Sequence, residues 1–132
     1  MTGRRTLLAN ASFTAVSAVV LIAAREGLYP LFGLTSPALL TPIGVALLLY
    51  AGTLVIEARR EPLQRYALLT AAVLDAGWVI GSVIVLLLAW SALAPAGRAL
   101  IIAAALIVEV FAFLQFRASR RTALEPGPEA HL

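Results

Sequence analysis

Four runs of this sequence are about 18 or more residues long and contain at most one charged side chain each. They lie between flanking charged residues and comprise 6–24, 27–56, 66–97 and 99–116. A helix needs about 20 mainly apolar residues to cross the ~30 Å hydrocarbon core of a bilayer. We therefore predict one membrane-spanning helix in each run, at about 6–24, 38–57, 66–90 and 98–117.

The composition points to the same class of protein. Hydrophobic residues make up 61% of the 132 residues and charged residues 13%, whereas a soluble domain averages about 45–50% and about 25%. The predicted fold is all-α, an up-down-up-down bundle of four transmembrane helices joined by short links. The prediction is a single membrane domain over 1–121 and a disordered cytoplasmic tail over 122–132.

Prolines mark two of the connections. Pro30 and Pro37 lie between the first two runs, and proline disfavours a helical conformation at the residue before it. The second span is therefore expected to begin near or after Pro37, with Pro42 in its first turn or at a kink. The stretch 94–97, Ala-Pro-Ala-Gly, is interpreted as the third connection.

The basic residues, all of them arginine, are divided unequally between the two ends of the predicted bundle. Eight lie at the end that holds both termini, and two lie at the other end. The eight are Arg4, Arg5, Arg59, Arg60, Arg65, Arg117, Arg120 and Arg121, and the two are Arg25 and Arg98. The positive-inside rule then places both termini in the cytoplasm. The chain uses arginine and no lysine, and it is rich in alanine and leucine. This composition suggests a bacterial source, and therefore the bacterial inner membrane.

The two halves of the chain resemble weak copies of each other. Pro37 corresponds to Pro95, and Arg59 to Arg117, at an offset of 58 residues. Apolar helices match one another easily, so chance similarity is an equal alternative to duplication. A true duplication would make two helical hairpins that form a parallel repeat.

Two carboxylates interrupt the spans. Asp75 follows Arg65 by ten residues, about 15 Å along a helix, and Glu109 precedes Arg117 by eight, about 12 Å. We expect both acids at similar depth on neighbouring helices, where they could relay a proton or flank a cation. The favoured alternative is that one or both are neutral and hydrogen-bonded within the bundle. The candidate partners are Asn10, Thr14, Tyr50 and Thr53.

Other polar residues gather in the same half of the bundle, while the opposite half is almost purely aliphatic. This asymmetry fits a water-accessible pocket or a hydrated bundle end equally well. Glu57 and Gln115 lie near the predicted ends of the second and fourth spans, at the edge of the membrane, where a polar side chain needs little explanation. Trp78 lies in mid-span, and its indole N–H is expected to bond Asp75, three residues earlier on the helix.

Small residues form two candidate packing faces. Gly77 and Gly81 make a GxxxG pattern in the third span, and Ala99 and Ala103 lie on the fourth. Such residues let helices approach closely. We expect them to pack within the chain rather than to make a homodimer.

The run 74–82, Leu-Asp-Ala-Gly-Trp-Val-Ile-Gly-Ser, together with 111–115, Phe-Ala-Phe-Leu-Gln, resembles a group of small bacterial four-span membrane proteins without an established activity. These share an Asp-x-x-Trp-x-x-Gly-Ser run in the third span and an aromatic-rich end to the fourth. The resemblance covers most of the chain. It implies four spans and directs attention to Asp75, Trp78 and Gln115, but it implies no reaction.

Several functions are disfavoured by what the sequence lacks. It contains no cysteine, and its one histidine is His131, near the end of the polar tail. We therefore expect no metal site and no cofactor, and no enzymatic activity, because no histidine base accompanies a serine or threonine in the membrane. Nucleic-acid binding is also not expected, because the arginines behind the net charge of +3 are explained by the orientation of the chain in the membrane.

Two functions remain. The first is a non-catalytic accessory or structural subunit, whose partners are membrane lipids and other membrane proteins or a second copy of itself. The second is a small oligomeric proton-linked transporter or channel that uses Asp75 and Glu109.

Overall fold

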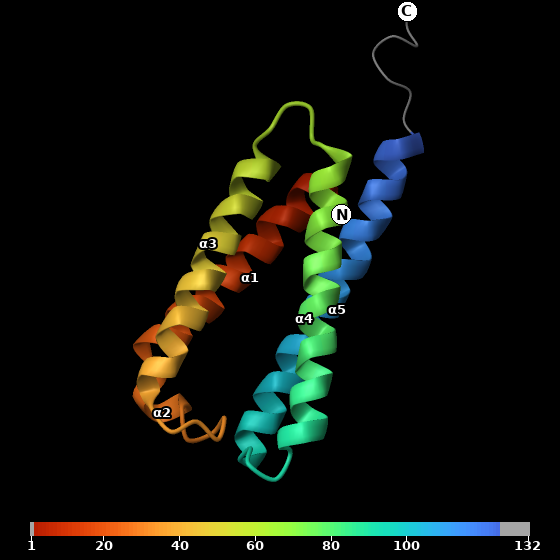
Figure 1. The fold of residues 1–132 in the computed structure, drawn as a ribbon. Coiled ribbons are helices and arrows are strands. Elements are labelled where there is room, and N and C mark those ends of the chain that lie inside the picture. Colours follow the sequence, from red (N-terminus) through yellow and green to blue (C-terminus); the bar gives the residue numbers. More distant parts are fainter. Residues whose placement is uncertain (1, 125–132) are drawn as a thin grey trace, which may run out of the picture.

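Four long helices run alternately up and down to form one elongated bundle (Figure 1). The computed structural model describes residues 2–124. The long helices are α1 (Gly3–Ala23), α3 (Leu40–Ala58), α4 (Arg65–Ala89) and α5 (Pro95–Leu124). Each is long and apolar enough to cross a membrane. The predicted all-α fold is therefore confirmed, and the chain is a multi-pass membrane protein.

Large apolar side chains cover the outside of the bundle. Leu49, Leu87 and Leu88 are 69%, 76% and 83% exposed. A water-soluble monomer rarely presents so continuous an apolar surface, whereas lipid tails solvate it readily.

The helix ends follow local chemistry. The side chain of Thr2 accepts a hydrogen bond from the backbone N–H of Arg5 at 3.2 Å, which lets α1 begin earlier than predicted. The first connection contains a short helix, α2 (Arg25–Leu28), and a 3₁₀ turn, η1 (Pro37–Leu39), so the predicted start near Pro37 is confirmed. Pro42 lies in the first turn of α3, where its missing N–H costs little.

The fourth helix differs most from its prediction. Pro95, assigned above to a connection, is the first residue of α5. Proline suits the first helical position because its fixed φ is helical and no partner is needed for the missing N–H. At the other end α5 continues to Leu124, well past the predicted end at 117. The tail residues 125–132 lie outside the described part of the chain.

The helices pair as two hairpins. α1 packs along α3, and α4 packs along α5, while α1 joins the hairpins through its contacts with α5. The backbones of α3 and α4 do not approach each other closely, and these two helices meet through side chains such as Tyr50 and Asp75. Both hairpins begin at the same end of the bundle, which is the arrangement expected of a parallel repeat.

A compact core joins the two hairpins near the end that holds the N-terminus. Its members are small or aliphatic side chains from all four long helices, namely Leu7, Ala11, Leu54, Ala58, Leu68, Ala71 and Ala118. Alanines at these positions bring the helix backbones close together, so van der Waals contact can hold them where lipid offers no hydrophobic driving force.

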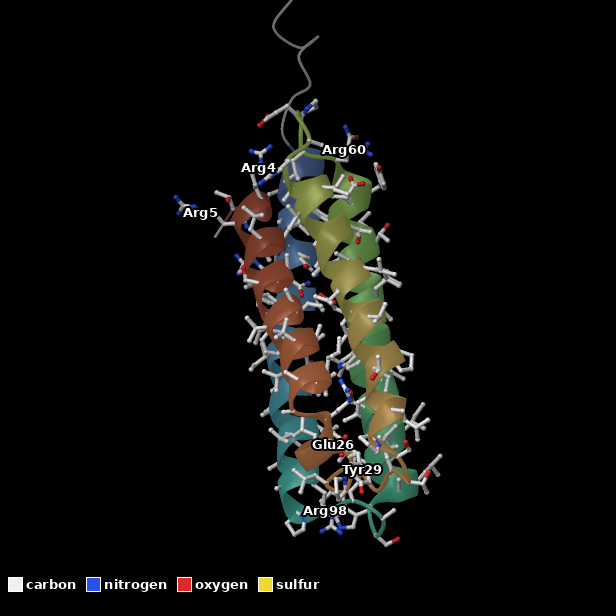
Figure 2. All side chains as sticks on the ribbon, turned by 90° about the vertical axis from the view of Figure 1, so that its left-hand side faces the viewer. Arg4, Arg5, Glu26, Tyr29, Arg60 and Arg98 are labelled. Carbon is white, nitrogen blue, oxygen red and sulfur yellow. The ribbon has the colours of Figure 1, made fainter. Side chains whose placement is uncertain are left out.

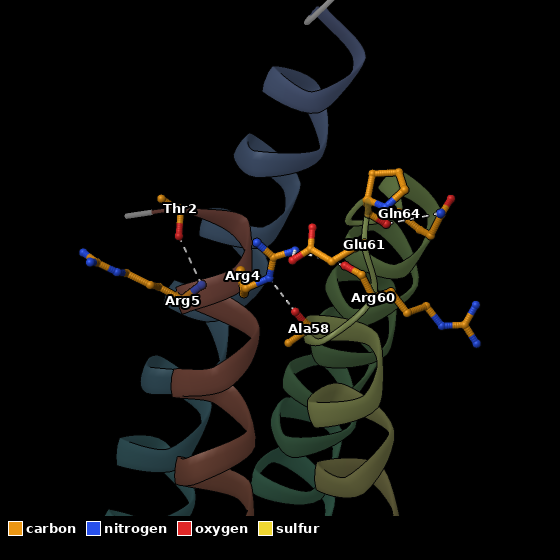
Figure 3. Close-up of polar contacts among 8 residues, drawn as sticks. Thr2, Arg4, Arg5, Ala58, Arg60, Glu61 and Gln64 are labelled. Atoms are coloured by element: carbon orange, nitrogen blue, oxygen red, sulfur yellow. Dashed lines mark hydrogen bonds and ion pairs between the residues drawn. The ribbon is translucent and has the colours of Figure 1, made fainter. Parts of the chain in front are cut away.

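Arginines bind backbone carbonyls at the same end. Arg4 donates from Nε to the carbonyl of Ala58 at 2.6 Å and from Nη2 to that of Arg60 at 3.0 Å, and it pairs with Glu61 at 3.1 Å (Figure 3). The last carbonyls of a helix have no partner within it and carry partial negative charge. Arg4 therefore ties the start of α1 to the end of α3, in addition to adding positive charge to this end.

The opposite end is closed by contact between two connections. Figure 2 shows Arg4, Arg5 and Arg60 at one end of the molecule, with Glu26, Tyr29 and Arg98 at the other. At this second end the backbone N–H of Ala94 donates to the carbonyl of Leu31 at 3.0 Å. Gly97 lies against that same carbonyl, which leaves no room for a Cβ atom.

Candidate functional site

A cluster of four polar side chains lies inside the bundle, one from each long helix. The carboxyl group of Asp75 is at its centre. Its Oδ2 accepts hydrogen bonds from Asn10 Nδ2 at 2.7 Å and from Gln115 Nε2 at 2.8 Å. Its Oδ1 accepts a third from the hydroxyl of Tyr50 at 2.9 Å. We call Asn10, Tyr50, Asp75 and Gln115 the central cluster.

Helical periodicity places these residues on the inner faces of their helices. Asn10 is flanked by buried Leu7 and Thr14 on α1, at spacings of three and four residues. Asp75 follows buried Ala71 on α4 by four. Residues three or four apart share one face of a helix, so the face that builds the core also carries the polar groups.

Three members of the central cluster are almost fully buried, while Tyr50 is partly buried. Asn10, Asp75 and Gln115 are 1%, 4% and 0% exposed. Asn10 also donates to Gln115 Oε1 at 2.8 Å, and its own Oδ1 accepts from the hydroxyl of Thr14 at 3.1 Å. Buried polar groups are costly when they lack a partner, and here each carboxyl and amide oxygen has at least one. The bonds therefore link the α1–α3 hairpin to the α4–α5 hairpin.

Gln115 is the member that the sequence alone places near the edge of the membrane. The sequence predicts that the last span ends near residue 117, which would leave Gln115 in its last turn. The helix continues to Leu124, so Gln115 lies well inside it and faces Asp75 across the hairpin. The resemblance to four-span proteins points to this residue, whereas its spacing from Arg117 does not.

The structure does not join Glu109 to Asp75. Glu109 lies at the middle of α5 but is exposed on the outer surface, in a groove of about 340 Å³ between α4 and α5. Ala76, Val79 and Ile80 line the α4 side of this groove. No hydrogen bond or ion pair of Glu109 is found within residues 2–124. A proton relay between the two acids therefore gains no support from their geometry.

Trp78 and Thr53 also lie outside the central cluster. Trp78 is 44% exposed and does not bond Asp75, whose two oxygens are occupied by Asn10, Gln115 and Tyr50. The expected Trp78–Asp75 bond is therefore wrong. Thr53 donates to the backbone carbonyl of Tyr50 on its own helix, at 2.7 Å.

The small residues expected to pack within the chain face outward. A Cβ atom added at Gly77 or Gly81 would meet nothing within 4 Å, and Ala99 and Ala103 are exposed. The expectation of packing inside the chain is wrong for the two glycines. The reason is the phase of α4: its inner face carries Leu68, Ala71 and Asp75, and the glycines lie on the side turned away from them.

A second groove, of about 270 Å³, lies between α3 and α4. It exists because the backbones of these two helices stay apart, although their side chains meet at Tyr50 and Asp75. Tyr50 of the central cluster forms part of its wall, so the groove leads from the outer surface toward Asp75. Its other lining residues are Thr53, Leu54, Glu57, Tyr66, Ala67, Thr70, Ala71 and Leu74.

Within the described residues, no three acidic or histidine side chains lie close enough together to hold a metal ion. Comparison with protein-family models, curated proteins and solved structures found no match to this chain.

Proposed function

We propose that this protein is a non-catalytic integral membrane protein that acts as an accessory or structural subunit. It binds other membrane proteins, or a second copy of itself, through the outer surface of α4 and α5. The observation that carries this proposal is the face of α4 at Gly77 and Gly81, which is open to the outside and turned away from the bundle's own core. Glycines there would let a partner helix approach closely.

Glu109 supports protein rather than lipid as the neighbour of this region. It lies at the middle of the membrane-spanning helix α5, exposed and without a partner among residues 2–124. A charged side chain at the bilayer centre costs about 2.5–3.5 kcal/mol on insertion scales. A partner helix that supplies a hydrogen-bond donor would reduce this cost.

The state of the central cluster supports a non-catalytic role. The oxygens of Asp75 are engaged by Asn10, Tyr50 and Gln115, and no histidine or nucleophile–base pair accompanies them. An acid that is buried and hydrogen-bonded in this way holds helices in register. The central cluster therefore stabilises the bundle, and the outer surface of α4 and α5 is the part that binds a partner.

The proposed location is the bacterial inner membrane, with both termini in the cytoplasm. The supporting observation is that Arg4, Arg5 and Arg60 lie at the end where the chain begins, and Arg98 lies at the opposite end (Figure 2). Cytoplasmic loops carry an excess of arginine and lysine.

The test is purification of the full chain from its native membranes in mild detergent, with mass spectrometry of the stoichiometric components. We expect a reproducible membrane-protein partner or a homo-oligomer. The double variant Gly77→Leu, Gly81→Leu should abolish the association. Gly52→Leu is the matched control, because Gly52 is an open glycine on α3. Recovery of only the monomer, or equal loss in both variants, would contradict the proposal.

A further inference from the structure

The groove between α3 and α4 has walls of two kinds. Leu54, Leu74 and Ala67 make it apolar, while Tyr50, Tyr66 and Glu57 give it two aromatic rings and a carboxylate. None of the lining residues within 2–124 is basic. Its position between two helices whose backbones stay apart makes it reachable sideways, from within the membrane.

Glu57 is not fully satisfied by its neighbours. Its Oε2 is inaccessible and accepts no hydrogen bond. Arg60 Nε lies 3.4 Å from this oxygen, close enough for an ion pair but without hydrogen-bond geometry, and the Arg60 side chain is 52% exposed. A buried carboxylate oxygen normally has a donor or a cation directly against it. Arg60 is therefore the ion-pair partner of the buried oxygen, while the Glu57 side chain as a whole stays 23% exposed.

The other polar groups of the groove are differently placed. The hydroxyls of Tyr50 and Thr53 are already used in hydrogen bonds to Asp75 and to the backbone. The Tyr66 side chain is 54% exposed, so its ring is available to a ligand. Thus the groove offers a ligand ring faces, aliphatic surface and one carboxylate, but few free hydrogen-bond donors.

We propose that this groove binds a lipophilic organic cation, such as a quaternary amine with an aromatic or alkyl substituent. Glu57 supplies the counter-charge, and the rings of Tyr50 and Tyr66 contact the cation face-on, as aromatic side chains do in sites for quaternary ammonium groups. Leu54 and Leu74 contact the apolar substituent. The absence of basic side chains from the lining disfavours an anionic ligand. This proposal does not depend on the accessory role, which uses a different surface.

The experiment measures binding of benzyltriethylammonium to the full chain in neutral detergent, by titration calorimetry against micelles without protein. We expect saturable binding of one cation per chain. Glu57→Gln should weaken it about tenfold or more, since a contact with a charged group is lost. Glu26→Gln is the matched control, because it removes an exposed carboxylate at the opposite end of the bundle, and it should bind the cation as the native chain does.

Thermal unfolding of each variant shows whether it is folded. If Glu57→Gln does not fold, Tyr66→Leu carries the test, because Tyr66 is a half-exposed side chain that the core does not need; we expect it to weaken binding severalfold. Absence of saturable binding, or equal affinity in Glu57→Gln and the native chain, would overturn the proposal. So would a copurified phospholipid in the groove that the cation cannot displace.

Discussion

Replacing Asn10 with alanine tests whether the central cluster holds the two hairpins together. Asn10 is on α1, and its two donor bonds reach Asp75 on α4 and Gln115 on α5. The substitution removes both bonds and leaves Gln115 Oε1 buried without this donor. It also removes the acceptor for the hydroxyl of Thr14. No change to the lipid-facing surface accompanies it, because Asn10 is only 1% exposed.

The size of the effect follows from these bonds. A hydrogen bond between membrane helices contributes on average about 0.6 and at most about 1.7 kcal/mol, so two contribute about 1–3 kcal/mol. The buried Gln115 oxygen adds a penalty of about 1 kcal/mol or more when it loses its donor. We expect Asn10→Ala to lower the free energy of unfolding by about 2–4 kcal/mol.

The assay is reversible unfolding in mixed micelles, followed by the fluorescence of the two tryptophans, Trp78 and Trp90. Ser12→Ala is the control on the same helix, because Ser12 is exposed and bonds only the carbonyl of Leu8. It should change stability by less than about 0.5 kcal/mol. An Asn10→Ala loss no larger than that of the control would refute the view that these bonds join the hairpins.

Three further predictions concern other parts of the bundle. Tyr50→Phe removes the donor to Asp75 Oδ1 and should cost about 1–2 kcal/mol in the same unfolding assay; no measurable loss would mean that this bond is dispensable. Gly97→Ala places a Cβ atom against the backbone of Leu31 and should lower the thermal unfolding midpoint by several degrees, while Gly81→Ala should not. Thr35 is exposed in the connection between α2 and η1, and Glu61 is exposed in the connection between α3 and α4. The native chain has no cysteine, so a membrane-impermeant maleimide applied to intact cells should label Thr35→Cys and spare Glu61→Cys; the reverse pattern would contradict the proposed orientation.

The number of spans and their approximate positions could be predicted because charge and hydrophobicity determine them directly. α4 agrees with its prediction to within a residue at each end. The ends of α5 could not be predicted in the same way. Pro95 fits both a connection and the first position of a helix, and arginines at 117, 120 and 121 can extend a helix as well as end a span.

The composition of the central cluster was only partly predictable. Asn10, Tyr50 and Asp75 are polar residues within spans, and each is expensive to bury alone, so their convergence could be anticipated. Which acid would lie inside was not predictable from depth alone. Asp75 and Glu109 are both mid-span, and only the rotation of each helix decides that Asp75 faces the core and Glu109 the outside.

The same uncertainty in helix rotation explains the glycines. A GxxxG pattern predicts close approach but does not identify the neighbouring helix. Gly77 and Gly81 lie on the side of α4 that its own chain leaves uncovered.

The most direct test of the account compares two substitutions of Asp75. Asparagine can keep the geometry: its oxygen can accept from Asn10 and Gln115, and its amide can donate to the hydroxyl of Tyr50. Leucine removes all three bonds to residue 75 and leaves the donors of Asn10, Tyr50 and Gln115 without this acceptor. We predict that Asp75→Asn stays within about 1 kcal/mol of the native stability and that Asp75→Leu loses about 3 kcal/mol or more. If Asp75→Asn is as damaging as Asp75→Leu, the carboxylate acts through its charge rather than as a hydrogen-bonded link between helices, and the account is contradicted.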